Sequence, residues 1–427
     1  KGPAVGGAGK LASGLFAVES SMQKAKYKNN PELLSQLTKD QLYKQLMDYN
    51  HYLSSASITR RVIDESSSTV DWMNKHGAKL ELIDWNPQQG QNPYPIRWRI
   101  YHRYVDNAGA FKNMYDAFGK LGGKLLLQTR AYDLTQDKDG NVTAVIAEKA
   151  DGGKLTIKTS AVILASGGYG ADQSLLPPKM KSFLFYGVDG ETGDGLKMGE
   201  AIGAATINMD LVKQYPQGVE TRPHHGLAAT ASSTDTMKKS GAIYVNRDGK
   251  RFVDEKDSGY MTQKLNGPVF DQMHRDGLGY VWAISDQASL DEKGVKRGLD
   301  MEFVVADTFE ELAEKMGLDA ATLSETLTNY NAYCDAGHDP EFGRLKLAKL
   351  NAPYCAVRVT PCEIITYGGI ARNENAEVIR ADGAVIPGLY TAGEATASSA
   401  YMGFTISNAF TWGRIAGSGA AAFALAK

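Results

Sequence analysis

The stretch Ala161-Val162-Ile163-Leu164-Ala165-Ser166-Gly167-Gly168-Tyr169-Gly170 decides the fold class of this chain. Its first five residues are apolar without interruption, which is typical of a strand buried on both faces of a parallel sheet. The strand runs directly into a glycine-rich turn. Ligand sites of open α/β sheets lie at such turns, beyond the carboxyl ends of the strands. The sequence therefore predicts an α/β domain with a ligand site at this turn.

A β-meander is expected immediately before this strand. The apolar run at 125–127 predicts a buried strand, and shorter strands are expected over 131–135, 142–148 and 155–158. Asp139-Gly140 and Asp151-Gly152 fall between the last three, and Asp-Gly pairs are typical of hairpin turns.

The remaining periodicity predicts helices before, within and after a middle region in which strands and helices are mixed. Helices are expected over 31–57, 66–76, 108–121, 307–316, 319–333 and 406–426. The last is rich in Ala and Gly, so it should pack closely against a sheet or cofactor. This order predicts a discontinuous Rossmann-type domain over 1–208 and 359–427, interrupted by an inserted α+β domain over 209–358.

Composition sets limits on function. The chain has 427 residues, 43% hydrophobic and 22% charged, which suits two globular domains. A net charge of −2 argues against nucleic acid or an anionic membrane as partner. No apolar run is long enough to predict a transmembrane segment. Three scattered cysteines and seven dispersed histidines predict neither a disulfide framework nor a metal site.

Four glycine-centred turns are candidate cofactor contacts: 6–14, 166–170, 192–195 and 391–394. Glycine lets backbone N–H groups approach a phosphate or a flat ring without an intervening Cβ. Taken singly, each is more typical of an ordinary turn, so their order along the chain carries the argument.

That order is the glycine-rich loop, the meander, VILASGGYG, GETGDGLKMGEAIGA, VNRDGKRFVDE, IPGLYTAGEAT and ISNAFTWGRIAG. It resembles the flavoprotein family of fumarate reductase and succinate dehydrogenase over nearly the whole chain. The resemblance implies FAD in the Rossmann-type domain and a capping domain that closes over the flavin. The family pattern opens with a strand and a GxGxxG loop, and this chain is expected to begin after them.

The resemblance also implies which residues contact FAD. The first segment has no histidine to which FAD could be linked, so noncovalent binding is expected. The implied cofactor residues are Gly6, Gly7, Lys10, Leu11, Ala12, Ser13, Gly14, Ala131, Tyr132, Ala165, Ser166, Gly167, Thr192, Asp194, Gly393, Glu394, Ser407 and Asn408.

The substrate site departs from the family pattern. Relatives that reduce dicarboxylates hold the carboxylates with two Arg and two His, and one Arg donates the proton. Here Tyr215 precedes the Pro where the first His is expected, and Ile365 lies where the second is expected. The predicted substrate-binding residues are Tyr215, Ile365 and Tyr367. No Arg follows the motif at 251–255 or lies beside Met402-Gly403. Fumarate is therefore a poor candidate, because a bidentate Arg is the usual device for a carboxylate. An enone, unsaturated lactone, aryl acrylate or steroid-like ring fits better.

The reaction still needs a proton donor beside the flavin. Tyr260 is the first candidate, Tyr401 the second, and Asp235 with Lys238 a candidate proton relay. Most of the 21 tyrosines must nevertheless be packing or surface residues, and the relay pair is equally typical of a solvated loop.

The leading interpretation is an FAD-dependent reductase of an activated C=C bond. No haem-attachment motif is present, so electrons are expected from a cytochrome, an FMN domain or a reduced carrier. Three alternatives stay open: a ketosteroid-type FAD dehydrogenase running the reverse reaction, a fumarate reductase-like dicarboxylate reductase, and a non-catalytic flavin-binding or electron-relay protein. Cytoplasmic and exported locations are equally open.

Overall fold

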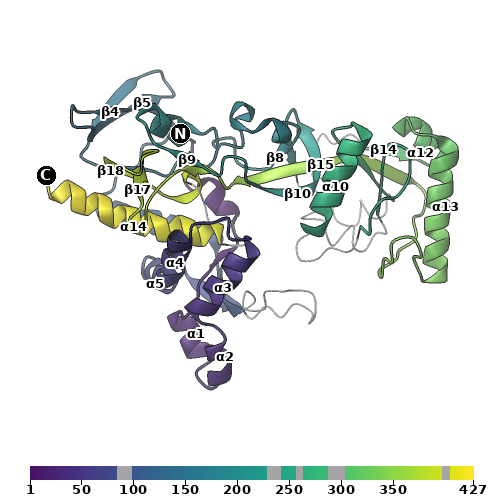
Figure 1. The fold of residues 1–427 in the computed structure, drawn as a ribbon, viewed down its shortest axis with the longest axis horizontal. Helices are drawn as coiled ribbons and strands as arrows, with labels where there is room; N and C mark the ends of the chain where they lie inside the picture. The colour runs from purple at the N-terminus through teal and green to yellow at the C-terminus, as the bar shows by residue number, and fades with distance from the viewer. Residues whose placement is uncertain (84–98, 228–241, 256–262, 287–302, 397–403) are drawn as a thin grey trace. The chain divides into compact units, whose positions relative to one another are not determined.

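The computed structural model describes residues 1–83, 99–227, 242–255, 263–286, 303–396 and 404–427. The chain divides into two compact units (Figure 1). Unit 1 comprises residues 1–177, 187–212 and 365–427, and unit 2 comprises residues 178–186 and 213–364. The combination of helices with parallel and antiparallel strands confirms the predicted α/β class.

The strand that decides the fold lies in a three-stranded sheet of unit 1. β7 (Val162–Leu164) pairs in parallel with β18 (Val385–Thr391), and β17 (Glu377–Ile379) pairs antiparallel with the other edge of β18. Helix α14 (Thr405–Leu425) packs along β18 and β7. A Cβ at Gly419 of this helix would lie 2.8 Å from the Tyr390 ring, so the predicted close packing is confirmed.

The predicted meander is confirmed and the strand predicted before it is not. β4 (Thr129–Gln136), β5 (Val142–Lys149) and β6 (Lys154–Lys158) form an antiparallel sheet. Residues 125–127 form no strand, and their three leucines are 42–52% exposed. A strand needs a neighbour for its backbone hydrogen bonds, and among the described residues no strand pairs with this stretch. Hydrophobicity alone therefore gave a wrong prediction there.

The described residues of 1–120 form helices around a small antiparallel sheet of order β1-β3-β2. Its strands are β1 (Gly14–Phe16), β2 (Leu80–Ile83) and β3 (Tyr101–Tyr104). The helices are α1 (Ser21–Lys26), α2 (Pro31–Ser35), α3 (Lys39–Tyr49), α4 (Ala56–Asp64), α5 (Ser66–Lys75) and α6 (Asn107–Lys120). The single helix predicted over 31–57 is divided because Thr38 and Ser55 cap new helices with their hydroxyl groups.

Three further short elements belong to unit 1. Helix α7 (Asp194–Ala201) follows the third glycine-centred turn, and β9 (Thr206–Ile207) pairs with β16 (Gly369–Ile370). The core packs around the inner face of α14, with Trp412 and Ala416 fully buried against Phe16, Val62 and Tyr390.

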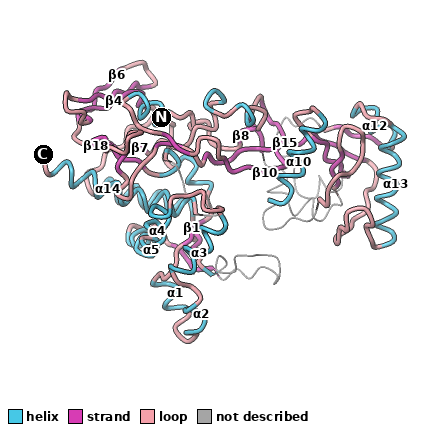
Figure 2. Tube along the Cα trace, viewed as in Figure 1, coloured by secondary structure: helices cyan, strands magenta, loops and turns pink. Residues whose placement is uncertain are grey.

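Unit 2 is built on a mixed sheet whose strand order is β10-β11-β8-β15-β13-β12, with β14 also paired to β15. The strands are β8 (Leu184–Phe185), β10 (Val212–Arg222), β11 (His225–Leu227), β12 (Ile243–Val245), β13 (Val281–Asp286), β14 (Val304–Ala306) and β15 (Tyr354–Thr366). Figure 2 shows β15 as a long strand, and the sequence did not predict it. Helices α12 (Phe309–Met316) and α13 (Ala320–Ala336) confirm the two predicted there, and α10 (Gln263–Asp276) was missed.

Candidate cofactor site

Three of the four glycine-centred turns meet in unit 1, at the carboxyl ends of β7 and β18. The Gly193 amide donates to the Gly168 carbonyl at 3.1 Å, and the Gly195 amide donates to Ser166 Oγ at 3.1 Å. The Ala392 amide donates to the Leu164 carbonyl at 3.0 Å, which joins the turn after β18 to the end of β7. Turns that are distant in the sequence thus form one surface at the edge where α/β proteins bind ligands.

Gly168 lies at a tight point of this surface. A Cβ there would be 2.3 Å from Thr366 Oγ1 and 2.4 Å from Glu394 Oε1. Thr366 donates to the same Glu394 oxygen from its amide at 2.7 Å and its hydroxyl at 3.0 Å. Desolvation nevertheless raises the pKa of Glu394 to about 7. A carboxyl group held this way is suited to accept hydrogen bonds from hydroxyl groups of a ligand.

The first glycine-rich loop contacts α14 through the strand that follows the loop. Ser407 Oγ accepts from the Phe16 amide at 2.9 Å and donates to its carbonyl at 2.7 Å. Within the loop, Gly6 has a φ of 111° and precedes a 3-10 helix, Gly7–Leu11. Ser13 Oγ lies 2.5 Å from the Tyr101 hydroxyl on β3. Loop and helix start are therefore fixed relative to each other.

Asp194 is bound from two sides. Arg130 donates to its two oxygens at 2.7 and 3.0 Å, and Lys1 donates to it at 2.8 Å. Burial alone raises the pKa of this carboxyl, but these bonds outweigh it and hold the pKa at about 2. Arg130 directly precedes Ala131 and the exposed Tyr132, so these two predicted cofactor residues adjoin the Asp194 turn.

This surface fits FAD. The 3-10 helix Gly393–Ala395 and helix α14 both begin without a side-chain cap. Uncapped N–H groups at a helix start attract phosphate and carbonyl oxygens. Gly6, Gly167, Gly193 and Gly393 all have positive φ, a conformation that brings backbone close to a ligand without a side chain. Asn408 also belongs to the first turn of α14, where its side-chain amide donates to the Phe404 carbonyl at 3.1 Å.

The four predicted catalytic residues, Tyr260, Tyr401, Asp235 and Lys238, lie outside the described residues. The predicted substrate residues are described and half-buried. Tyr215 belongs to unit 2, where it packs beside Leu184, Cys362 and Tyr186. Ile365 and Tyr367 belong to unit 1, where the Tyr367 amide donates to the Leu211 carbonyl at 2.8 Å.

Sequence reasoning missed Arg130, Thr366 and Tyr101. Each binds a predicted cofactor residue, namely Asp194, Glu394 and Ser13. No pattern in the sequence connects positions that are 64, 28 and 88 residues apart. A signal existed only for Arg130, because it stands next to the predicted Ala131.

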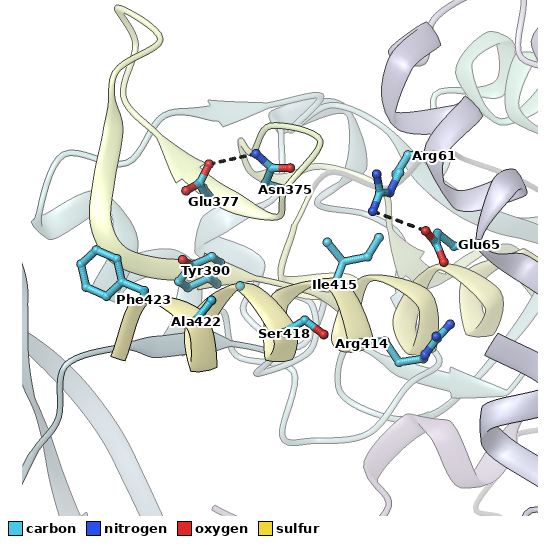
Figure 3. A pocket seen from close by; sticks show the side chains of 11 residues that line it. Arg61, Glu65, Asn375, Glu377, Tyr390, Arg414, Ile415, Ser418, Ala422 and Phe423 are labelled. Atoms are coloured by element: carbon cyan, nitrogen blue, oxygen red, sulfur yellow. Dashed lines mark hydrogen bonds and ion pairs between the residues drawn. The ribbon is translucent and has the colours of Figure 1, made fainter. Parts of the chain in front are cut away.

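A separate pocket of about 490 Å³ lies between α14, α4 and the β17–β18 hairpin. Figure 3 shows two interactions among the residues that line the pocket. Arg61 points toward Glu65, and Asn375 points toward Glu377. Arg414 donates to Ser68 and Thr69. None of the residues that line the pocket is a predicted cofactor or substrate residue. Arg61 and Glu65 form an ion pair, and Glu377 and Arg414 bind uncharged side chains.

Comparison with known proteins supports FAD binding by this chain. The family model of the FAD binding domain matches residues 1–405. The chain is 32% identical to NADH:acrylate oxidoreductase of Vibrio harveyi, over 87% of this chain and 37% of that protein. It is 30% identical to fumarate reductase (cytochrome) of Shewanella frigidimarina, over 99% of this chain and 72% of that protein. It is 28% identical to vinyl phenol reductase of Lactiplantibacillus plantarum, over 92% of this chain and 83% of that protein.

The open conformation of a flavocytochrome c3 fumarate reductase superposes with a TM-score of 0.77 at 26% identity, covering 100% of this chain and 73% of that chain. Fold and site together thus define an FAD-binding flavoprotein. The chain belongs to the fumarate reductase/succinate dehydrogenase flavoprotein family, as its motifs predicted. None of the helices in the described ranges is long and apolar enough to cross a membrane. Within those ranges, no group of three His, Cys, Asp or Glu side chains is placed to hold a metal ion.

Proposed function

We propose that this chain is the flavoprotein part of an enzyme that saturates an activated C=C bond in a substrate other than a dicarboxylate. One observation carries the proposal. Tyr215 and Ile365, which are half-buried, occupy positions where dicarboxylate reductases of the family are expected to have histidines. Neither of these two side chains carries the positive charge with which Arg or protonated His binds a carboxylate.

The surroundings of Tyr215 support an aromatic or apolar substrate. Its ring contacts apolar residues in unit 2, and the Lys213 ammonium lies 5.6 Å from the ring centre. A cation near a ring face is attracted to the electrons of the ring. We therefore interpret Tyr215 as a packing group for the substrate and not as a ligand for an anion. The relative named for vinyl phenol supports a substrate without a carboxylate, and the relatives named for acrylate and fumarate support a C=C bond.

We assign FAD to unit 1 and the capping role to unit 2. Ser166, Gly168, Gly193 and Glu394 would contact the cofactor, and the start of α14 would face one end of it. Bound FAD supplies the hydride. The chain's own residues must orient the double bond and deliver a proton to the carbon next to the one that receives hydride. Tyr260 is the first candidate for the donor of that proton, and Tyr401 is the second. Asp235 and Lys238 are the proposed relay that supplies the donor with a proton.

Noncovalent binding of FAD is part of the proposal. Acid precipitation should release all of the flavin into the supernatant, with an absorbance maximum near ~450 nm. Flavin that stays with the precipitated protein would contradict it.

The function is tested under anaerobic conditions with the flavin reduced by a viologen dye. Reoxidation of the flavin is followed after addition of an aryl acrylate, a vinyl phenol, a cyclic enone, an unsaturated lactone or fumarate. We expect at least one uncharged or aryl compound to reoxidise the flavin faster than fumarate does. Fastest reoxidation by fumarate would contradict the proposal. Dye-linked oxidation of a saturated ketone without ene reduction would favour the ketosteroid-type dehydrogenase, and no reoxidation by any compound would favour a non-catalytic flavoprotein.

A further inference from the structure

Two acidic side chains lie on the predicted cofactor surface of unit 1, and their hydrogen bonds differ. Glu394 accepts both bonds from Thr366 on one oxygen, Oε1. Within the described residues no hydrogen bond reaches its other oxygen. Glu394 therefore keeps an acceptor for a ligand.

The carboxylate of Asp194 has no acceptor left. Arg130 donates from Nη2 to Oδ1 at 2.7 Å and from Nε to Oδ2 at 3.0 Å. Thr192 Oγ1 adds a bond to Oδ1 at 3.1 Å, and Lys1 Nζ adds one to Oδ2 at 2.8 Å. A carboxylate has about four acceptor sites. The protein itself therefore fills those of Asp194.

Burial makes the charge of Asp194 depend on its partners. The Asp194 side chain is 7% exposed, whereas that of Arg130 is 54% exposed. A buried carboxylate that loses a partner keeps a charge that water cannot solvate. FAD contains a diphosphate, so a negative charge without a counter-charge on its binding surface would repel it. Arg130 thus neutralises this part of the surface.

The Arg130–Asp194 pair also joins two segments that are distant in the sequence. Arg130 belongs to β4, and helix α7, which begins at Asp194, packs on that strand. The same turn is bonded to the turn after β7 through Gly193 and Gly195. The 192–195 turn is therefore held by β4 as well as by the turn after β7.

The pair lies next to an irregularity in β4. Ala131 pairs with Ala147 and Asp133 pairs with Ile146, so Tyr132 is the extra residue of a β-bulge. A bulge changes the direction of a side chain and is common beside binding sites. Arg130 precedes Tyr132 by two residues, so its bond to Asp194 fixes the bulge relative to the 192–195 turn.

We propose that Arg130 is a positioning residue for FAD, which acts through Asp194 to hold the bulged stretch of β4 against the 192–195 turn. The Asp194 carboxylate is then an internal partner of Arg130 and not a ligand of FAD. This inference rests on the assignment of FAD to unit 1 in the proposed function. Its test needs no substrate.

The test measures the Kd of FAD by titrating apoprotein and following the change in flavin fluorescence. Arg130→Met should raise Kd about tenfold, because Asp194 keeps its charge and loses two of its four bonds. Arg130→Lys keeps the charge but loses the bidentate geometry, so we expect about a threefold rise. Thermal unfolding of each apoprotein shows whether it is folded, and Arg130→Lys replaces Arg130→Met if the latter is not.

Asp194→Asn distinguishes a positioning role from a direct contact with FAD. Asparagine carries no charge and can still accept from Arg130, so Kd should rise less than in Arg130→Met. The double variant with both substitutions should bind FAD at least as tightly as Arg130→Met, because no buried charge is left without its partner. A larger rise for Asp194→Asn than for Arg130→Met, or two rises that multiply in the double variant, would overturn the inference.

Arg103→Met is the matched control. Arg103 is 53% exposed and donates to Glu81 from Nε and Nη2 at 3.0 and 2.6 Å. Neither residue is a predicted cofactor residue, so Kd should keep its wild-type value. An equal rise in Arg103→Met and Arg130→Met would overturn the inference, because any lost ion pair of unit 1 would then weaken FAD binding.

Gly168→Ala tests the cofactor surface independently of Arg130. If Gly168→Ala loses FAD while Arg130→Met keeps the wild-type Kd, only the role of Arg130 is overturned. If neither substitution changes FAD binding, the assignment of FAD to this surface fails as well.

Discussion

The guanidinium carbon of Arg372 lies 3.8 Å from the centre of the Trp412 ring, in the core of unit 1. Trp412 is fully buried and Arg372 is 5% exposed. All three guanidinium nitrogens are buried without an acceptor among the described residues. Desolvation lowers the pKa of Arg372 to about 9, so the group is still cationic at neutral pH. A stack on tryptophan offsets only part of the cost of burying a charge.

Arg372→Met should therefore stabilise the protein. Methionine can cover the same ring without a charge, and we expect a gain of about 1–4 kcal/mol in the free energy of unfolding at pH 7. Because the folded pKa is below its usual value, the cost is complete below pH 9 and falls as pH rises above it. The gain, measured by thermal unfolding, should shrink above pH 9. Arg380→Met is the control, since Arg380 donates to the Ile202 carbonyl at 2.9 Å and should lose stability. A lower melting temperature for Arg372→Met would contradict this reasoning.

Gly168→Ala should remove FAD. Its Cβ would meet two oxygen atoms at 2.3 and 2.4 Å, so Thr366 or Glu394 must move from the cofactor surface. We expect flavin content after purification to fall at least tenfold, at a cost of about 1–3 kcal/mol in stability from overpacking. Gly119→Ala on α6 is the matched control, because a Cβ there meets nothing within 4 Å. Full flavin content in Gly168→Ala would mean that the turn does not contact the cofactor.

Glu394 should make the FAD-free protein pH-sensitive. Desolvation raises the pKa of this carboxyl to about 7 when the protein is folded. The folded state then binds a proton more readily than the unfolded state does, so stability rises as pH falls from above 7 toward about 4.5. Comparing melting temperatures of the wild type and Glu394→Gln from pH 8.5 to 5.5 isolates this contribution. An identical pH dependence in both proteins would exclude a raised pKa at Glu394.

Asp194→Asn should destabilise unit 1 in a pH-dependent way. The pKa of Asp194 is about 2 in the folded protein, below its usual value. Its contribution is therefore present above about pH 4 and is lost as pH falls toward 2. With Arg130 half-exposed, we expect about 1–2 kcal/mol at pH 7. Asp139→Asn, in an exposed hairpin turn, is the control. Equal denaturant midpoints for Asp194→Asn and wild type at pH 7 would show that the pair contributes nothing.

Tyr260→Phe should lower kcat about 100- to 10,000-fold without reducing flavin content, because it removes the proposed proton donor. Tyr401→Phe is expected to have a smaller effect. Tyr333→Phe on α13 makes the same chemical change at a residue that is not a predicted site residue, and it should be neutral. If turnover of the true substrate is unchanged in both Tyr260→Phe and Tyr401→Phe, the proton comes from elsewhere.

Local pattern predicted much of the secondary structure. Strand β7, the meander and helix α14 were expected, because periodicity and Asp-Gly turns are properties of neighbouring residues. The leucines at 125–127 show the limit of this reasoning. An apolar run becomes a strand only if another strand pairs with it, and sequence alone does not supply that neighbour.

By itself the sequence determined the α/β class, the glycine turn at 166–170 and the order of motifs that marks the flavoprotein family. Only the tertiary structure decided that Gly168 faces Glu394, that Arg130 reaches Asp194, and that Arg344 joins Ala242 to Glu255. The physical reason is separation along the chain. Turns and periodicity depend on adjacent residues, whereas a buried carboxyl or guanidinium takes its partner and its pKa from whichever elements pack around it.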